Sequence, residues 1–240
     1  MSSKAKSLEA NTRVRTIVGL RNAYPKYPIT LDQFQVPYGS GFNVTLRPEL
    51  LQEPFSYSRP ARVFTNSTSD PFHLHVPFAF VDMKMGVIGD CRQHHFQMLT
   101  KRAERMAEYF KCRKVPRNLW LGVSVENKDQ GVPRIKHLQS INAAVRWLSI
   151  EPLLEDIGTL DLDGIHWVVV GGESGSKKVR PMHIDWVRSI RDQCVERGIA
   201  FFFKQWGSHD ADGMYQHKSK TGRVLDGRTW DEIPVELPSE

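Results

Sequence analysis

Polar and charged side chains that could bind a ligand follow apolar, strand-like stretches at six places in the sequence. They are Asn66, Ser69 and Asp70; Lys101 and Arg102; Ser124, Glu126 and Asn127; Glu151; Gly171, Gly172, Glu173 and Ser174; and Lys204 and Gln205. In parallel α/β sheets and barrels, the loops that leave the carboxyl ends of the strands converge and form the ligand site. These residues are therefore predicted to lie together at one rim, provided that the strands are parallel.

The elements that must position them alternate between strands and helices. Strands are predicted in VFT (63–65), HHFQML (94–99), NLWLGVSV (118–125), AAVRWLSI (143–150), IHWVVV (165–170) and IAFFFKQ (199–205). Helices are predicted over 76–88, from the polar turn 100–102 through Phe110, over 133–139, and from Ile184 until Gly198 stops the helix. FNVTLRPELL is interpreted as an earlier strand followed by a helix that begins at Pro48. The β-branched residues Val168 to Val170 mark the best candidate for a central strand. This alternation predicts an α/β fold, a partial or complete parallel (β/α) TIM-like barrel.

Length and composition favour one main domain. The chain has 240 residues, of which 40% are hydrophobic and 25% charged, which is ordinary globular composition. We divide it into an irregular segment 1–42, a barrel-like domain 43–207 and a polar tail 208–240, which packs one tryptophan back on the domain. The polar start and the absence of an apolar stretch of about 18 residues predict a cytoplasmic protein without a membrane partner.

The charge balance favours anionic partners without deciding for them. The formal net charge is +6, which attracts nucleotides or nucleic acid through their phosphates. Lysines and arginines are nevertheless spread along the chain, as in many basic proteins that bind no nucleic acid.

Each candidate position also has a purely structural interpretation. Lys101 and Arg102 stand at a helix start, where cations are unfavourable, so a bound anion would relieve the conflict; the alternative is two solvated charges. Asn66 to Asp70 could instead cap the following helix. The three glutamates could be balanced by lysines and arginines of the chain itself, such as Arg180, without any ligand.

Familiar catalytic and metal-binding motifs do not occur. The GGESG turn (171–175) is not a GxGxxG motif, and the chain has no Walker A, HExxH or GxSxG sequence. The cysteines, Cys91, Cys112 and Cys194, are too far apart in sequence for a CxxC metal site, and Cys194 is interpreted as core packing. His94 and His95 could equally well be packing, surface or metal-binding residues.

Several segments together resemble the phage gp-thirty-seven/gp-sixty-eight family, proteins of unknown function associated with phages and plasmids. The segments are NSTSDPFH, FQMLTKR, LWLGVSVEN, SIEPLL, WVVVGGESG, RPMHIDWVRSIRDQC and FFFKQWG, within residues 41–207, and the later DGRTWDEIP. That family is similar to radical SAM enzymes such as spore photoproduct lyase. The resemblance implies a radical-SAM-like (β/α) barrel that carries a [4Fe–4S] cluster and S-adenosylmethionine.

The sequence departs from this family at the cluster. Residues 1–42 contain no cysteine, whereas family members usually have a cluster of cysteines there to hold the iron. Three hypotheses follow. The leading one is a radical-SAM-like protein without a cluster that binds a nucleotide, nucleic acid or a phage or host protein, in phage–host conflict. The others are an active SAM-dependent enzyme that modifies or repairs nucleic-acid bases, and an inhibitor of a host defence complex.

Overall fold

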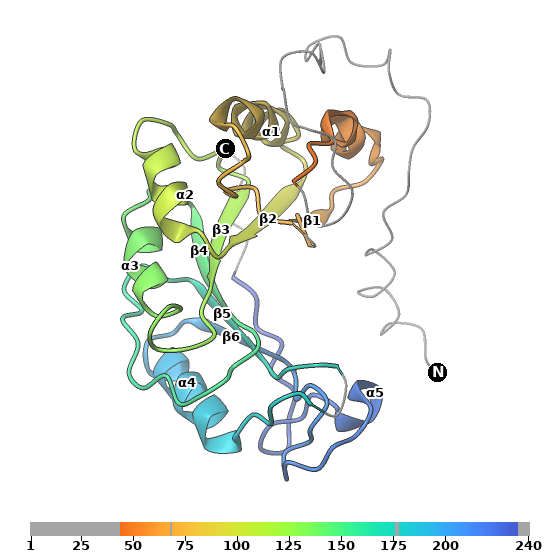
Figure 1. Ribbon diagram of the computed structural model, residues 1–240, viewed down its shortest axis with the longest axis vertical. Helices are drawn as coiled ribbons and strands as arrows, with labels where there is room; N and C mark the ends of the chain where they lie inside the picture. Colours follow the sequence, from red (N-terminus) through yellow and green to blue (C-terminus); the bar gives the residue numbers. More distant parts are fainter. Residues whose placement is uncertain (1–43, 68, 176–177, 235–240) are drawn as a thin grey trace.

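Six parallel strands form one sheet that curls into a half-barrel (Figure 1). The computed structural model describes residues 44–67, 69–175 and 178–234. The strands are β1 (Arg62–Thr65), β2 (His95–Thr100), β3 (Leu119–Ser124), β4 (Val145–Ile150), β5 (Trp167–Gly171) and β6 (Ala200–Gln205). Each strand pairs with the next one along the chain, in the order β1 to β6. The predicted α/β fold, in its partial-barrel form, is confirmed.

Helices cover the outer face of this sheet. In chain order the helical elements are η4 (Pro48–Ser56), α1 (Phe78–Asp90), α2 (Ala103–Phe110), α3 (Pro133–Gln139), α4 (Ile184–Glu196) and α5 (Lys218–Thr221). Figure 1 shows α1 to α4 following one another around the outside of the strands. The connection from β4 to β5 is different, because residues 151–166 run through turns and extended chain.

The two faces of the sheet are packed with different side chains. Successive residues of a strand point to opposite faces. In β3, Leu119 and Leu121 join the main core under the helices, whereas Trp120 belongs to a second cluster on the inner face. That second cluster contains Trp120, Val145, Trp147, Trp167 and Val169. Its tryptophans come from the first halves of their strands, so the other end of the inner face is left to smaller and polar residues.

Three predicted details differ from the structure. Residues 44–47 of FNVTLRPELL are not a strand, because Val44 and Leu46 bury their side chains against the core without pairing with the sheet. Pro48 does begin a helix, but it is a 3-10 helix. The run Val168 to Val170 lies in β5, which is paired on both sides yet stands next to the edge strand. A fully apolar strand marks burial on both faces, and α4 and the tryptophan cluster provide that burial away from the centre.

Residues near the carboxyl end complete the free edge of β6. Phe203 N–H donates to Trp230 O at 2.9 Å, and Asp231 forms an antiparallel bridge with Phe202. The Trp230 ring lies edge-on against Phe201, with 5.7 Å between centroids. The predicted segment 1–42 lies outside the described residues. Among the residues that the structure describes, no helix has the length and apolar character needed to cross a membrane.

Candidate functional site at the carboxyl rim

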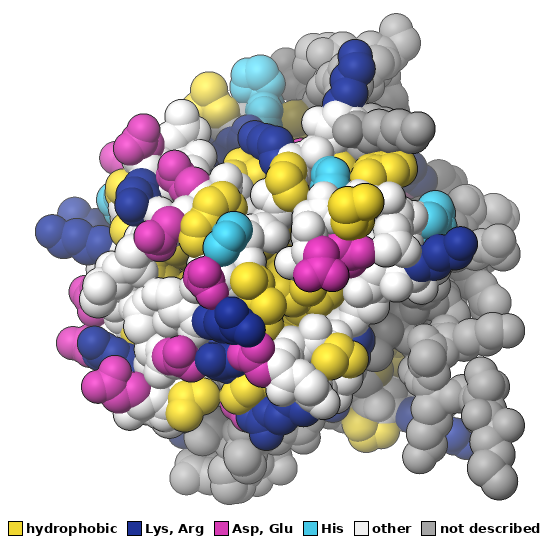
Figure 2. Space-filling model, turned by 90° about the horizontal axis from the view of Figure 1, so that it is seen from below, with side chains coloured by type: hydrophobic (Ala, Val, Ile, Leu, Met, Phe, Trp, Pro, Cys, Tyr) yellow, Lys and Arg dark blue, Asp and Glu magenta, His cyan; other side chains and the backbone are white. Residues whose placement is uncertain are grey.

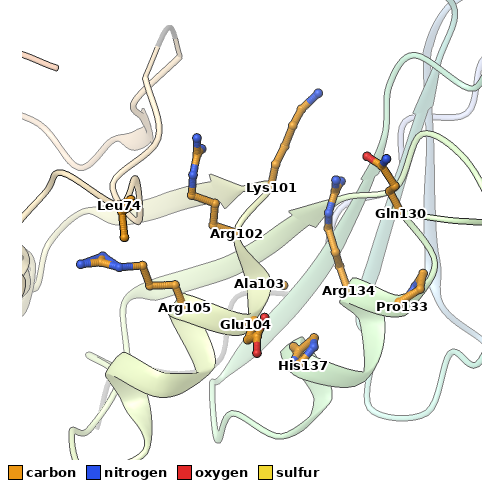
Figure 3. A pocket seen from close by; sticks show the side chains of 10 residues that line it. All are labelled: Leu74, Lys101, Arg102, Ala103, Glu104, Arg105, Gln130, Pro133, Arg134 and His137. Carbon is orange, nitrogen blue, oxygen red and sulfur yellow. The ribbon is translucent and has the colours of Figure 1, made fainter. Parts of the chain in front are cut away.

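A cavity of about 370 Å³ lies where the carboxyl ends of β2 and β3 meet α2 and α3 (Figure 3). Its wall consists of Leu74, Lys101, Arg102, Ala103, Glu104, Arg105, Gln130, Pro133, Arg134 and His137. Figure 3 shows Lys101, Arg102 and Arg134 extending side by side beyond the strand ends. Four of the lining side chains are cationic, and one is acidic. The cavity is therefore suited to an anion.

Glu126 lies directly behind two of these cations. Only 6% of the residue is exposed, and its carboxylate forms ion pairs with Lys101 and, at 2.8 Å, with Arg134. Arg134 also donates to the backbone oxygen of Ser124 at 2.6 Å. Burial opposes ionisation of Glu126, but the hydrogen bonds from Lys101 and Arg134 outweigh it and hold the pKa of its carboxyl below the ordinary value. Glu126 is thus a buried anion that pairs with two of the cations lining the cavity.

Asp70 fixes the loop after β1 to the start of α2. Its carboxylate accepts hydrogen bonds from Thr100 Oγ1 at 2.7 Å, from the Lys101 amide at 3.2 Å and from the Arg102 guanidinium at 2.8 Å. The alternative that Asp70 caps the next helix is wrong, because α1 begins at Phe78 without a side-chain capping bond. Asn66 and Ser69 bond to each other at 2.8 Å in the same loop.

Arg105 brings a further positive charge to the cavity. Its guanidinium donates to the backbone oxygens of His73 at 3.3 Å and Val76 at 3.1 Å, and it lies 4.3 Å from the ring centroid of Phe78. Within the described residues, these acceptors are uncharged carbonyls, so no carboxylate neutralises Arg105. Leu74, which is 72% exposed, lies beside it at the edge of the cavity.

At the other end of the rim, Glu151 is held on the inner face by Lys204. Lys204 Nζ lies 3.2 Å from the Glu151 carboxylate, to which the Ser149 hydroxyl donates at 3.4 Å. A Cβ on Gly171 would stand 2.5 Å from Glu151 Oε1, so glycine leaves the room that this carboxylate fills.

Glu173 binds Arg180, which lies seven residues later in the chain. Its carboxylate accepts hydrogen bonds from the Arg180 guanidinium and from the Arg180 amide, both at 2.8 Å, and these bonds lower its pKa to about 2. Gln205 Nε2 donates to Ser174 Oγ at 2.9 Å, which joins the loops after β5 and β6. All three rim glutamates therefore have cationic partners within the chain, as the structural interpretation expected.

The structure brings together only some of the predicted residues. Lys101 and Arg102 line the cavity, and Glu126, Ser124 and Asp70 hold its cations. The Asn127 side chain instead accepts from the amides of Gln130 and Gly131, which makes it a turn residue. The residues contributed by β4, β5 and β6 do not line this cavity: Glu151, Gly171, Gly172, Glu173, Ser174, Lys204 and Gln205.

Sequence reasoning missed Arg105, Arg134 and His137. Arg105 follows Arg102 by three residues, so the two share one face of a helix. Pro133 is the first residue of a predicted helix, and Arg134 comes next. The start of that helix follows the strand that ends near Ser124, so Arg134 lies at the same rim as Ser124. These spacings are the signals that could have pointed to Arg105 and Arg134.

The donor set does not fit an iron–sulfur cluster. Cys91 is buried at the end of α1 and Cys194 is buried within α4, and burial raises the pKa of their thiols to about 11 and about 12. Cys112 is exposed after α2. Within the described ranges, no group of three histidine, cysteine, aspartate or glutamate side chains is arranged to hold a metal ion. His94 is fully buried and accepts a hydrogen bond from the amide of Ala61, which is a packing role.

Comparison with known proteins identifies the family. Residues 15–234 match the family described as "Protein of unknown function (DUF5131)". The chain belongs to this family. No curated protein and no solved structure matches the chain. The family covers the half-barrel and the residues that close its edge, and its description assigns no activity.

Proposed function

We propose that this chain binds a phosphate-bearing ligand of the nucleotide type, either free or within a nucleic acid, in the cavity between α2 and α3. The observation that carries the proposal is the set of four cationic side chains around a cavity at the carboxyl rim. Arginine guanidinium groups match phosphate oxygens in geometry and in charge.

The local charge balance supports an anionic ligand. The four cations face three carboxylates, from Glu104, Glu126 and Asp70, which leaves an excess of one positive charge. Lys101 and Arg102 keep 59% and 40% of their side chains exposed, so both remain accessible to a ligand. A charge-assisted hydrogen bond to phosphate is stronger than one between neutral groups.

The positive charge that matters is local. Figure 2 shows lysine and arginine side chains interspersed with aspartate and glutamate over the face seen from below. The net charge of +6 therefore does not form one basic surface on that face. The concentration of cations at the cavity supports recognition of a defined ligand there.

The size and edge of the cavity support a nucleotide-sized ligand. Its volume of about 370 Å³ lies near the lower end of small-molecule sites, which span roughly 300 to 1,000 Å³. The exposed side chain of Leu74 gives an apolar contact next to Arg105, where a base could lie while its phosphates bind the cations.

The test is calorimetric titration of the full chain with inorganic phosphate, ATP and a short single-stranded oligonucleotide. The double variant Lys101→Gln/Arg102→Gln is expected to weaken binding at least about tenfold, since it removes two phosphate contacts. The matched control is Lys111→Gln/Lys114→Gln, which removes two exposed lysines just after α2, away from the cavity.

Each outcome has a defined meaning. Equal affinities of the two double variants, or no binding of any phosphate ligand, would contradict the proposal. Tighter binding of ATP than of the oligonucleotide would identify a free nucleotide, and the reverse a nucleic acid. A further titration with S-adenosylmethionine tests the enzyme alternative, because binding of that cation in place of phosphates would favour it.

A further inference from the structure

We infer that Glu126 is an internal competitor of the ligand: its carboxylate occupies the position between Lys101 and Arg134 that a phosphate group takes on binding. The inference rests on the proposed function and adds to it a residue that sets affinity and selectivity. The charge of Glu126 neutralises part of the positive charge of the ligand-free cavity, so that only a strongly charged anion displaces Glu126 from its partners.

The contacts of Glu126 identify it as an exchangeable partner. Among the described residues, its carboxylate bonds to two side chains, Lys101 and Arg134, and both line the cavity. Lys101 is 59% exposed, so its long side chain can turn from Glu126 to a ligand without unfolding anything. Arg134 is 15% exposed and keeps its bond to the Ser124 oxygen when Glu126 is replaced.

Asp70 gives the contrast that makes the assignment specific. It also pairs with a lining cation, Arg102, but it accepts from the backbone amides of Phe72 and Lys101 as well. Replacing Asp70 would release the loop after β1, so this carboxylate is part of the scaffold. The Glu126 carboxylate has only side-chain partners among the described residues, and its displacement leaves the backbone in place.

Competition also selects among ligands. A carboxylate beside the cavity repels any incoming anion, and this repulsion is stronger near a buried site than in water. A doubly charged phosphate ester gains more from four cations than a singly charged carboxylate does. Glu126 therefore excludes monocarboxylates and admits phosphates, and removing its charge is expected to relax this selectivity.

The experiment compares Glu126→Gln with the unchanged chain, using inorganic phosphate, ATP and acetate as probes in calorimetric titration. Glutamine keeps the size of the side chain and removes its charge. We expect phosphate and ATP to bind at least about tenfold more tightly, which is about 1.4 kcal/mol, and acetate to become a measurable ligand. The matched control is Glu108→Gln on the same helix as Arg105, exposed and outside the cavity, which should change affinity less than about twofold.

The outcomes separate the two proposals. If the unchanged chain binds phosphate and Glu126→Gln binds it equally or more weakly, the competitor role is wrong while the proposed function stands. If neither protein binds phosphate or ATP, the proposed function fails and the competitor role fails with it. Should Glu126→Gln not fold, Glu126→Asp replaces it: its shorter side chain draws the carboxylate back from both cations, so affinity should rise severalfold, and unchanged or weaker binding overturns the inference.

Discussion

The two ends of the carboxyl rim differ in what occupies them: charged side chains at one end and backbone at the other. Between α2 and α3 the rim is open, and long charged side chains line a cavity of about 370 Å³. At β5 and β6 the rim is closed by backbone, since a Cβ on Gly172 would stand 1.9 Å from the carbonyl oxygen of Trp206. Side chains can exchange partners at the first end, whereas at the second end the backbone fills the space beside Gly172.

The glutamates at the two ends show the same difference. Glu126 holds cations from two different elements, Lys101 and Arg134. Glu173 is bound by the side chain and the amide of Arg180 within its own loop. An ion pair between separate elements can respond to a ligand, while one within a single loop fixes the loop. The sequence pattern of a strand followed by glutamate is common to both.

The closed end should be the more sensitive to added volume. Gly172→Ala is expected to reduce the free energy of unfolding by about 3 kcal/mol, because the new methyl group meets backbone that cannot move aside. Gly89→Ala in α1 is the control, since a Cβ there meets nothing within 4 Å and alanine favours the helix by about 0.5 to 1 kcal/mol. Denaturant unfolding measures both. A similar small effect of the two substitutions would remove the contrast between the two ends.

The two partners of Glu126 should contribute unequally to stability. Arg134→Met is expected to cost about 2 kcal/mol, because it removes charged hydrogen bonds to Glu126 and to the Ser124 oxygen in a nearly buried position. Lys101→Met should cost less than about 1 kcal/mol, because the lysine side chain is largely exposed. Thermal and urea unfolding compare the two variants. A larger loss for Lys101→Met would mean that Lys101 is structural and not free to turn to a ligand.

The ion pair between Glu173 and Arg180 should make a small contribution to stability that is lost in acid. The pKa of Glu173 is lowered from 4.5 to about 2 in the folded chain, so its stabilising contribution is present above about pH 4.5 and is lost as the pH falls towards 2. Asp226, whose pKa is also about 2 because of Arg188 and Arg191, contributes in the same window. Urea unfolding at each pH gives the difference in free energy of unfolding between the unchanged chain and Glu173→Gln, and this difference isolates the contribution of the Glu173–Arg180 pair. A difference that stays constant from pH 5 to 2.5 would contradict the assignment.

Local sequence was sufficient for the order of elements but not for their contacts. Runs such as NLWLGVSV predict strands because apolar and β-branched residues end at polar turns, and β3 lies there. Pro133 and Gln139 bound a predicted helix that the structure places over the same residues. These features depend on neighbours in sequence, so they are readable from it.

The partners of the rim side chains were not readable in this way. Asp70 meets Arg102 across 32 residues, and Lys204 meets Glu151 across 53. Nothing local distinguishes Glu126 at a cavity from Glu173 in a closed loop, because the difference lies in which elements fold beside them. Prediction of the site therefore stopped at a list of rim residues, of which the cavity uses a part.

The order of strands has a consequence for how the chain is made. Since each strand pairs with its predecessor, the sheet can grow in one direction as the chain leaves the ribosome, with β1 and β2 pairing first. The last step is different, because Glu232 O accepts the indole N–H of Trp167 in β5 and Trp230 O binds β6. Until residues 230–232 emerge, the β6 edge of the growing sheet is unpaired, so these residues decide when that edge is covered.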